Sequence, residues 1–104
     1  MVTVGMYYDV IPEKSGIFTA KFQEVIALMA TIPGHKVTYL YQRVGDPNSF
    51  AIMSEWDDRE SFLKFIGSET FRSVTQWGRE QVLRGAPRHK IYPGSEDLGR
   101  PSSV

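Results

Sequence analysis

The most restrictive feature of this sequence is the turn GDPNS at residues 45–49, which joins two segments with the character of β-strands. Lys36–Val44 and Phe50–Trp56 are rich in β-branched and aromatic residues, which favour strands. Gly, Asp, Pro, Asn and Ser are the residues that tight turns prefer. The middle of the chain is therefore predicted to form an antiparallel hairpin, and any fold for this chain must accommodate it.

The segment before the hairpin reads as one strand followed by one helix. Val2–Val10 alternates between two faces, with Val, Val, Met and Tyr on one of them. In Gly16–Ile32 the apolar residues recur at helical spacing, and Ser15 is positioned to cap that helix. The sequence PGH at residues 33–35 is predicted to end it.

The segment after the hairpin is predicted to contain two short helices in succession. Asp57 and Asp58 are candidate N-caps for the first, and Glu60 lies three residues beyond Asp57, the spacing of a capping box. Gly67 is expected to end this helix, and Ser68 to cap the next.

The second of these helices is predicted to run to about Leu83, and Arg88–Tyr92 reads as a last short strand. The resulting order, β-α-β-β-α-β, is that of the α+β ferredoxin-like sandwich, a four-stranded antiparallel sheet with all helices on one face. We expect one domain over residues 1–92. Residues 93–104, rich in Pro, Gly and Ser, are expected to form a flexible C-terminal tail.

Both faces of the predicted sheet carry apolar or aromatic side chains. By strand alternation, Tyr39 and Tyr41 share one face with His35, whereas Leu40 and Val44 lie on the other. Helices on one face leave the second face uncovered, and exposed apolar patches of that kind usually mark an interface. We therefore expect a homodimer in which two sheets pack face to face.

Composition restricts the possible functions. Twelve basic and twelve acidic residues cancel, which argues against a nucleic-acid partner. The absence of cysteine excludes disulfides, thiolate metal sites and cysteine nucleophiles. The two histidines, His35 and His89, stand in no HxH, HxxxH or HxxE spacing, so no metal site is implied. No signal peptide or membrane-spanning segment is apparent, and a cytoplasmic protein is the default expectation.

Several short motifs, taken in order, resemble a known family. IPGH after the first helix, GDPNSF in the hairpin, SEW at the strand end and SFLKFIGSETF after it are similar to antibiotic-biosynthesis-monooxygenase domains of the dimeric α+β barrel superfamily. The resemblance covers roughly residues 2–92. It implies the same fold and dimer, and a reaction in which aromatic polyketides or quinols are oxidised by dioxygen without a metal, flavin or other cofactor.

A heme-degrading branch of this superfamily keeps an Asn, a Trp and a His at positions that resemble Asp9, Phe65 and Thr75 here. All three depart from the pattern, so the resemblance implies no proximal iron ligand at Thr75. Some members that oxidise polyketides also keep the Trp, which Phe65 replaces.

A cofactor-free oxygenase needs a dry pocket for a flat aromatic substrate, a base, and a donor for the resulting oxygen anion. We expect the pocket between sheet and helices, with walls formed by Phe62, Phe65, Phe71 and Trp77. Plain core packing is the alternative for each of these aromatic residues.

His35 is the candidate base, because imidazole titrates near neutral pH. Tyr7 and Asp9 share a strand face and could hold or deprotonate a substrate oxygen. Tyr39 could line the pocket or fill the dimer core. Arg72 and Arg79 of the last helix are expected to be solvent-exposed, and Arg72 in particular could hold an acidic substrate group at the pocket mouth.

Three functions are compatible with these residues. The first is a small dimeric oxygenase, the second a module that binds a small hydrophobic ligand without turnover, and the third a protein that binds or degrades heme through another ligand such as His35.

Overall fold

A computed structural model describes residues 1–93 of the chain. These residues form four strands and three helices in the predicted order, with the second helical segment split in two. The elements are β1 Val2–Asp9, α1 Ser15–Met29, β2 His35–Arg43, β3 Asp46–Trp56, α2 Arg59–Ile66, α3 Glu69–Gln81 and β4 Arg88–Pro93. Of the expected tail, residues 94–104 lie outside the described part.

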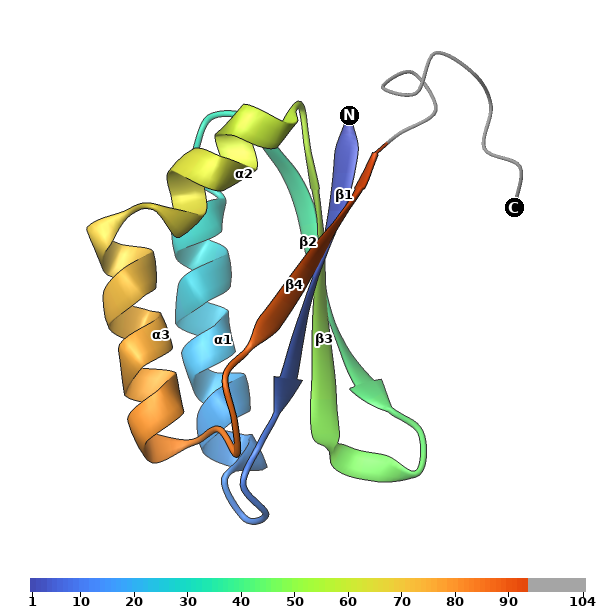
Figure 1. Cartoon of the computed structure of the whole chain (residues 1–104), viewed down its shortest axis with the longest axis vertical. Coiled ribbons are helices and arrows are strands. Elements are labelled where there is room, and N and C mark those ends of the chain that lie inside the picture. Colours follow the sequence, from blue (N-terminus) through green and yellow to red (C-terminus); the bar gives the residue numbers. More distant parts are fainter. Residues whose placement is uncertain (94–104) are drawn as a thin grey trace.

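The four strands form one antiparallel sheet in the order β2-β3-β1-β4. Figure 1 shows α1 and α3 side by side against one face of this sheet, with α2 near one end of the strands. The predicted ferredoxin-like architecture is therefore confirmed.

The core lies between the sheet and the helices, and Trp56 is at its centre. Trp56 is fully buried, and its indole N–H donates to the buried hydroxyl of Ser54 at 2.9 Å. The rings of Phe62 and Phe65 pack against it with centroids 5.8 and 5.6 Å away. This aromatic cluster fixes α2 to the end of β3.

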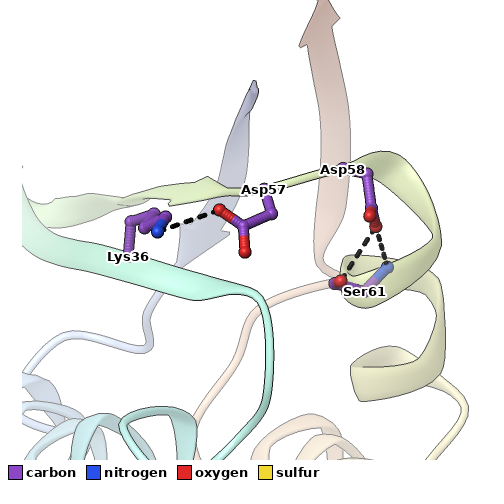
Figure 2. A network of polar contacts seen from close by, with 4 residues as sticks. All are labelled: Lys36, Asp57, Asp58 and Ser61. Atoms are coloured by element: carbon purple, nitrogen blue, oxygen red, sulfur yellow. Dashed lines mark hydrogen bonds and ion pairs between the residues drawn. The ribbon is translucent and has the colours of Figure 1, made fainter.

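One aspartate caps α2, and its neighbour makes a different contact (Figure 2). The Asp58 carboxylate accepts hydrogen bonds from the backbone N–H and the hydroxyl of Ser61, both at 2.8 Å. Asp57 instead forms an ion pair with Lys36 of β2 at 3.0 Å. Asp58 is therefore the cap, and the predicted capping box between Asp57 and Glu60 is wrong, because Asp57 lies one residue too far from the first turn.

The predictions for the other helix ends have mixed outcomes. The Ser68 hydroxyl accepts from the backbone N–H of Phe71 at 3.2 Å, so Ser68 caps α3, and Gly67 ends α2 as predicted. Ser15 is not a cap: it is the first helical residue of α1, and its carbonyl accepts from the Thr19 hydroxyl. The helix also ends at Met29, before the predicted Ile32.

A β-bulge near the start of β2 changes the side on which His35 lies. The pairing with β3 shifts between His35 and Val37, so strand alternation does not carry through this point. His35 Nε2 lies 2.6 Å from Thr38 Oγ1, and its ring packs edge-on against Trp56 at 5.1 Å. Tyr39 is 55% exposed on the other face. The prediction that His35 shares a face with Tyr39 is therefore wrong.

The hairpin turn is tighter than the sequence pattern indicates. β3 begins at Asp46, so only Val44 and Gly45 separate it from β2, and Gly45 adopts a φ of 93° that favours glycine. The Asp46 carboxylate accepts from the backbone N–H of Asn48 at 3.1 Å, which stabilises the start of the strand.

Candidate functional site

A small hollow lies between the sheet and helices α1 and α3. Its volume is about 50 Å³, and its wall is almost entirely apolar. β1 and β3 contribute Met6, Tyr8 and Ile52, α1 contributes Phe18 and Phe22, and α3 contributes Phe71, Thr75 and Trp77. We call this space the inner hollow.

Tyr8 places a phenol group in the wall of the inner hollow. Its hydroxyl donates to the Met6 sulfur at 3.7 Å, a weak acceptor, and its ring packs on Phe18 with centroids 5.3 Å apart. Burial raises the pKa of Tyr8 far above its ordinary value. The group is therefore a neutral phenol whose single O–H donates only to a weak acceptor, in surroundings of low polarity.

A cation–π contact lies at the wall between α1 and α3. The Lys21 ammonium lies 5.0 Å from the centroid of the Trp77 ring, and Lys21 also forms an ion pair with Glu24 at 2.9 Å. Both Lys21 and Trp77 line the inner hollow, so this contact helps to enclose it.

Two larger surface hollows adjoin the inner one, and together we call them the outer cleft. One, of about 200 Å³, shares Met6, Tyr8, Phe71 and Thr75 with the inner hollow. The other, of about 310 Å³, lies along α3 and shares Phe71, Thr75 and Arg79 with the first. Shared walls make the inner hollow and the outer cleft neighbouring parts of one region.

Some predicted site residues meet in this region and others do not. Phe71 and Trp77 line the inner hollow, and Arg72 lines the outer cleft. Phe62 and Phe65 are instead fully buried around Trp56 and line neither space. Their position matches the alternative of core packing, and a role in substrate binding stays a prediction.

Three predicted site residues, Tyr7, Asp9 and Tyr39, lie away from the hollow, on the sheet face opposite the helices. The Tyr7 hydroxyl lies 2.8 Å from the Tyr92 hydroxyl, and this hydrogen bond raises the pKa of Tyr7. Asp9 forms a 3.7 Å ion pair with Arg88. The structure therefore does not bring these residues together with Phe71 and Trp77.

His35 also lies outside the hollow. It packs against Trp56 at the other end of the sheet, and burial lowers its pKa below the ordinary value. The histidine nearest the hollow is His89 of β4, which lines the outer cleft and packs on Phe62 with centroids 5.7 Å apart.

Sequence reasoning did not select Tyr8 or Thr75 as site residues, and it favoured Arg72 over Arg79 and His35 over His89. Alternation along β1 already placed Tyr8 on the same face as Met6, which the structure buries under the helices. That signal could have identified Tyr8 as the phenol of the cleft. Arg79 follows Arg72 by seven residues, two helical turns, which places both on one side of α3.

The sequence model of antibiotic biosynthesis monooxygenases matches residues 1–77. The chain belongs to the antibiotic biosynthesis monooxygenase family. Among curated members and relatives, the Bacillus subtilis protein YcnE, provisionally named a monooxygenase, is 28% identical over 88 residues, which cover 84% of this chain and 90% of YcnE.

Higher identities come from longer proteins, and this chain matches only one region of each. Proteins of Natronomonas pharaonis and Haloquadratum walsbyi, provisionally named heme-binding, are 40% and 38% identical over 87 residues. The match covers 84% of this chain but only 14% and 16% of those proteins. The heme-binding name therefore belongs to proteins of which this chain matches a minor part.

Solved structures place this family member among proteins of the same fold. A conserved protein from Methanosarcina mazei Go1 superposes with a TM-score of 0.80 at 22% identity, covering 97% of this chain and 92% of that one. SnoaB, a cofactor-independent oxygenase from Streptomyces nogalater, gives a TM-score of 0.77 at 19% identity, over 89% and 91% of the two chains.

Two features are absent from residues 1–93. No group of three or more His, Asp or Glu side chains in this part of the antibiotic biosynthesis monooxygenase domain is arranged to hold a metal ion. Within the same residues, no helix has the length and apolar character needed to cross a bilayer.

Proposed function

We propose that this chain oxidises a flat, electron-rich aromatic molecule, a quinol or anthrone, with dioxygen and without a metal or organic cofactor. The observation that carries the proposal is the apolar inner hollow with a half-buried phenol, Tyr8, in its wall. Family membership supports the reaction class, and the hollow supplies the environment that such chemistry needs.

The reaction balances without a further reductant. An anthrone loses a proton from its ring methylene, whereas a quinol loses a phenolic proton. In either anion the electron-rich ring carbon passes electrons to dioxygen and forms a C–O bond, and the peroxide takes up a proton to give a hydroperoxide. Loss of the remaining hydrogen of that carbon as a proton cleaves the O–O bond, leaves a carbonyl group and releases the distal oxygen as water. One oxygen atom enters the product, the other leaves as water, and the substrate supplies all the electrons.

The role of Tyr8 is to donate a hydrogen bond to the substrate oxygen on which negative charge develops. Because burial raises its pKa, the phenol stays protonated over the whole neutral range. A preorganised donor in a site that excludes water stabilises such a charge more than the same donor does in water.

The proposed base is His89, since its ring lines the outer cleft beside Tyr8 and Phe71. Asp9 and His35, the bases expected from the sequence, lie outside that space. His89→Ala should lower kcat, whereas His35→Ala should leave kcat unchanged.

The size of the hollow restricts how the substrate lies. Small-molecule sites usually enclose about 300 Å³ or more, so 50 Å³ cannot hold an aromatic ring system. We propose that the rings lie in the outer cleft, and that their reacting edge reaches Tyr8, which lines both the outer cleft and the inner hollow.

Oxygen uptake tests this function. Anthrone and a series of hydroquinones are added to the purified protein in an oxygen electrode, and the product is identified by mass spectrometry under ¹⁸O₂. We expect one labelled atom per product and one dioxygen per turnover. Binding without oxygen uptake would identify a ligand-binding module instead, and uptake that releases hydrogen peroxide would contradict the monooxygenase balance.

Heme is the second ligand to consider, because four relatives are provisionally named heme-binding. The inner hollow does not fit it, because this hollow is far smaller than a porphyrin and no histidine lines it. A heme would have to lie in the outer cleft, where His89 is the histidine among the lining residues. We expect a heme titration to give no saturable Soret shift. A shift that is lost in His89→Ala would reverse this conclusion.

We also propose that two copies pair through the sheet face opposite the helices. Tyr39 and Tyr41 are 55% and 54% exposed there, and packing against a second sheet would cover them. Sedimentation should find a dimer that Tyr39→Asp weakens. Leu63→Asp, at an exposed apolar residue of α2, is the matched control, and a monomeric wild-type chain would refute the pairing.

A further inference from the structure

The charges around the outer cleft are of one sign. The chain as a whole has twelve basic and twelve acidic residues. The residues that line the two hollows of the outer cleft nevertheless include Arg72, Arg79 and Arg88, and neither lining contains an Asp or Glu. A concentration of positive charge at a surface hollow favours the approach of an anionic ligand.

The two arginines of α3 are available for a ligand. No ion pair within residues 1–93 engages Arg72 or Arg79, and both are exposed. Glu80, the carboxylate next to Arg79, accepts a hydrogen bond from Gln76 at 3.2 Å. Arg88 differs from them, because Asp9 lies 3.7 Å from its guanidinium group and partly neutralises it.

Both arginines line the same hollow as the apolar side chains of Ile66 and Phe71. Arg72 and Arg79 are seven residues apart, so they project from one side of α3 about 10 Å from each other along the helix. Between them lie Thr75 and Gln76, and Phe71 and Ile66 form the apolar part of the same hollow. An aromatic ring on Phe71 would therefore have a guanidinium group within reach at either end.

We propose that the substrate is a polycyclic aromatic acid whose carboxylate is bound by Arg79 at the rim of the outer cleft, with Arg72 as a second anchor at the other end of the ring system. Arg79 is the main anchor, because it lines both hollows of the cleft, whereas Arg72 lines one. The planar guanidinium group matches a carboxylate with two parallel hydrogen bonds. This inference rests on the proposed function, since it concerns the same cleft.

The test compares an acid with its uncharged isostere under nitrogen. Anthraquinone-2-carboxylate and anthraquinone-2-carboxamide are titrated into the full chain by calorimetry, and quenching of tryptophan fluorescence serves as a second readout because Trp77 lines the inner hollow. For exposed ion pairs we expect the wild type to bind the acid about fivefold more tightly than the amide. At high salt the ratio should decrease.

Substitutions assign the preference to the two arginines. In the double variant Arg72→Gln/Arg79→Gln the ratio of the two affinities should decrease to about one, and Arg79→Gln alone should account for most of the loss. Arg59→Gln removes an exposed arginine of α2 that lines neither hollow, and it should keep the wild-type ratio.

Three outcomes would overturn the inference: equal affinity for acid and amide in the wild type, a preference that survives in the double variant, or no binding of either compound. The proposed oxygenase activity is tested separately, by oxygen uptake of the wild type with anthrone, which has no carboxylate. A chain that prefers the acid but consumes no oxygen would retain the inference about the ligand and lose the proposed reaction.

Discussion

Replacing Tyr8 by phenylalanine tests the proposed chemistry with little disturbance of the fold. Within residues 1–93 the Tyr8 hydroxyl has one hydrogen-bond contact, to the Met6 sulfur at 3.7 Å. Sulfur is a weak acceptor, and a typical hydrogen bond contributes only about 1 kcal/mol to net stability. Tyr8→Phe should therefore change the free energy of unfolding by less than about 1 kcal/mol, with the ring still packed on Phe18.

The effect on catalysis should be much larger. A donor aimed at developing negative charge in a dry site is worth about 100- to 1000-fold in kcat when it is removed. Oxygen uptake with anthrone measures the loss, and urea unfolding of the same samples measures stability. KM should change less than kcat, because the hydrogen bond strengthens as charge develops in the transition state.

The matched control is Tyr41→Phe, which removes an exposed phenol on the opposite face of the sheet. It should leave kcat unchanged. If Tyr8→Phe retains kcat within threefold of the wild type while the protein stays folded, the phenol is not the donor and the proposed mechanism is refuted. A loss of stability well above 1 kcal/mol would refute the structural argument, because it would require a stronger partner for the hydroxyl.

Three further predictions concern the frame around the cleft. Phe65→Ala should lower the free energy of unfolding by about 3–5 kcal/mol in urea, because Phe65 is buried against Trp56; an effect below 1 kcal/mol would contradict its place in the core. Burial lowers the pKa of His35 below 6.5, so the unfolded chain binds more protons than the folded chain at mildly acidic pH. The free energy of unfolding should therefore be highest above pH 6.5 and decrease as the pH is lowered, and His35→Gln should flatten this dependence. Gly34→Ala should cost at least about 1–2 kcal/mol, because Gly34 has a φ of 92° and an added Cβ would collide with the Ser61 side chain; an unchanged thermal midpoint would refute this.

Capping and helix-end patterns in the sequence predicted the structure correctly where the interacting residues are close in sequence. Ser68 caps α3 because its hydroxyl meets the backbone N–H three residues later, and Gly67 ends α2 because a short apolar run stops there. The same rules could not choose between Asp57 and Asp58. Both suit an N-cap, and the choice became clear only when Lys36, 21 residues earlier in the chain, was placed beside Asp57.

The order of strands and helices, the hairpin and hence the sheet topology follow from the sequence alone, because alternation, helical spacing and turn residues act over a few neighbouring positions. The tertiary structure decided which side chains meet. A bulge that exists only through pairing with β3 turned His35 toward Trp56, and the packing of α1 and α3 on the sheet enclosed Tyr8 while Phe62 and Phe65 filled the core. The lining of a cavity depends on how elements that are far apart in the sequence pack against each other. The residue pattern within one element carries no information on that packing.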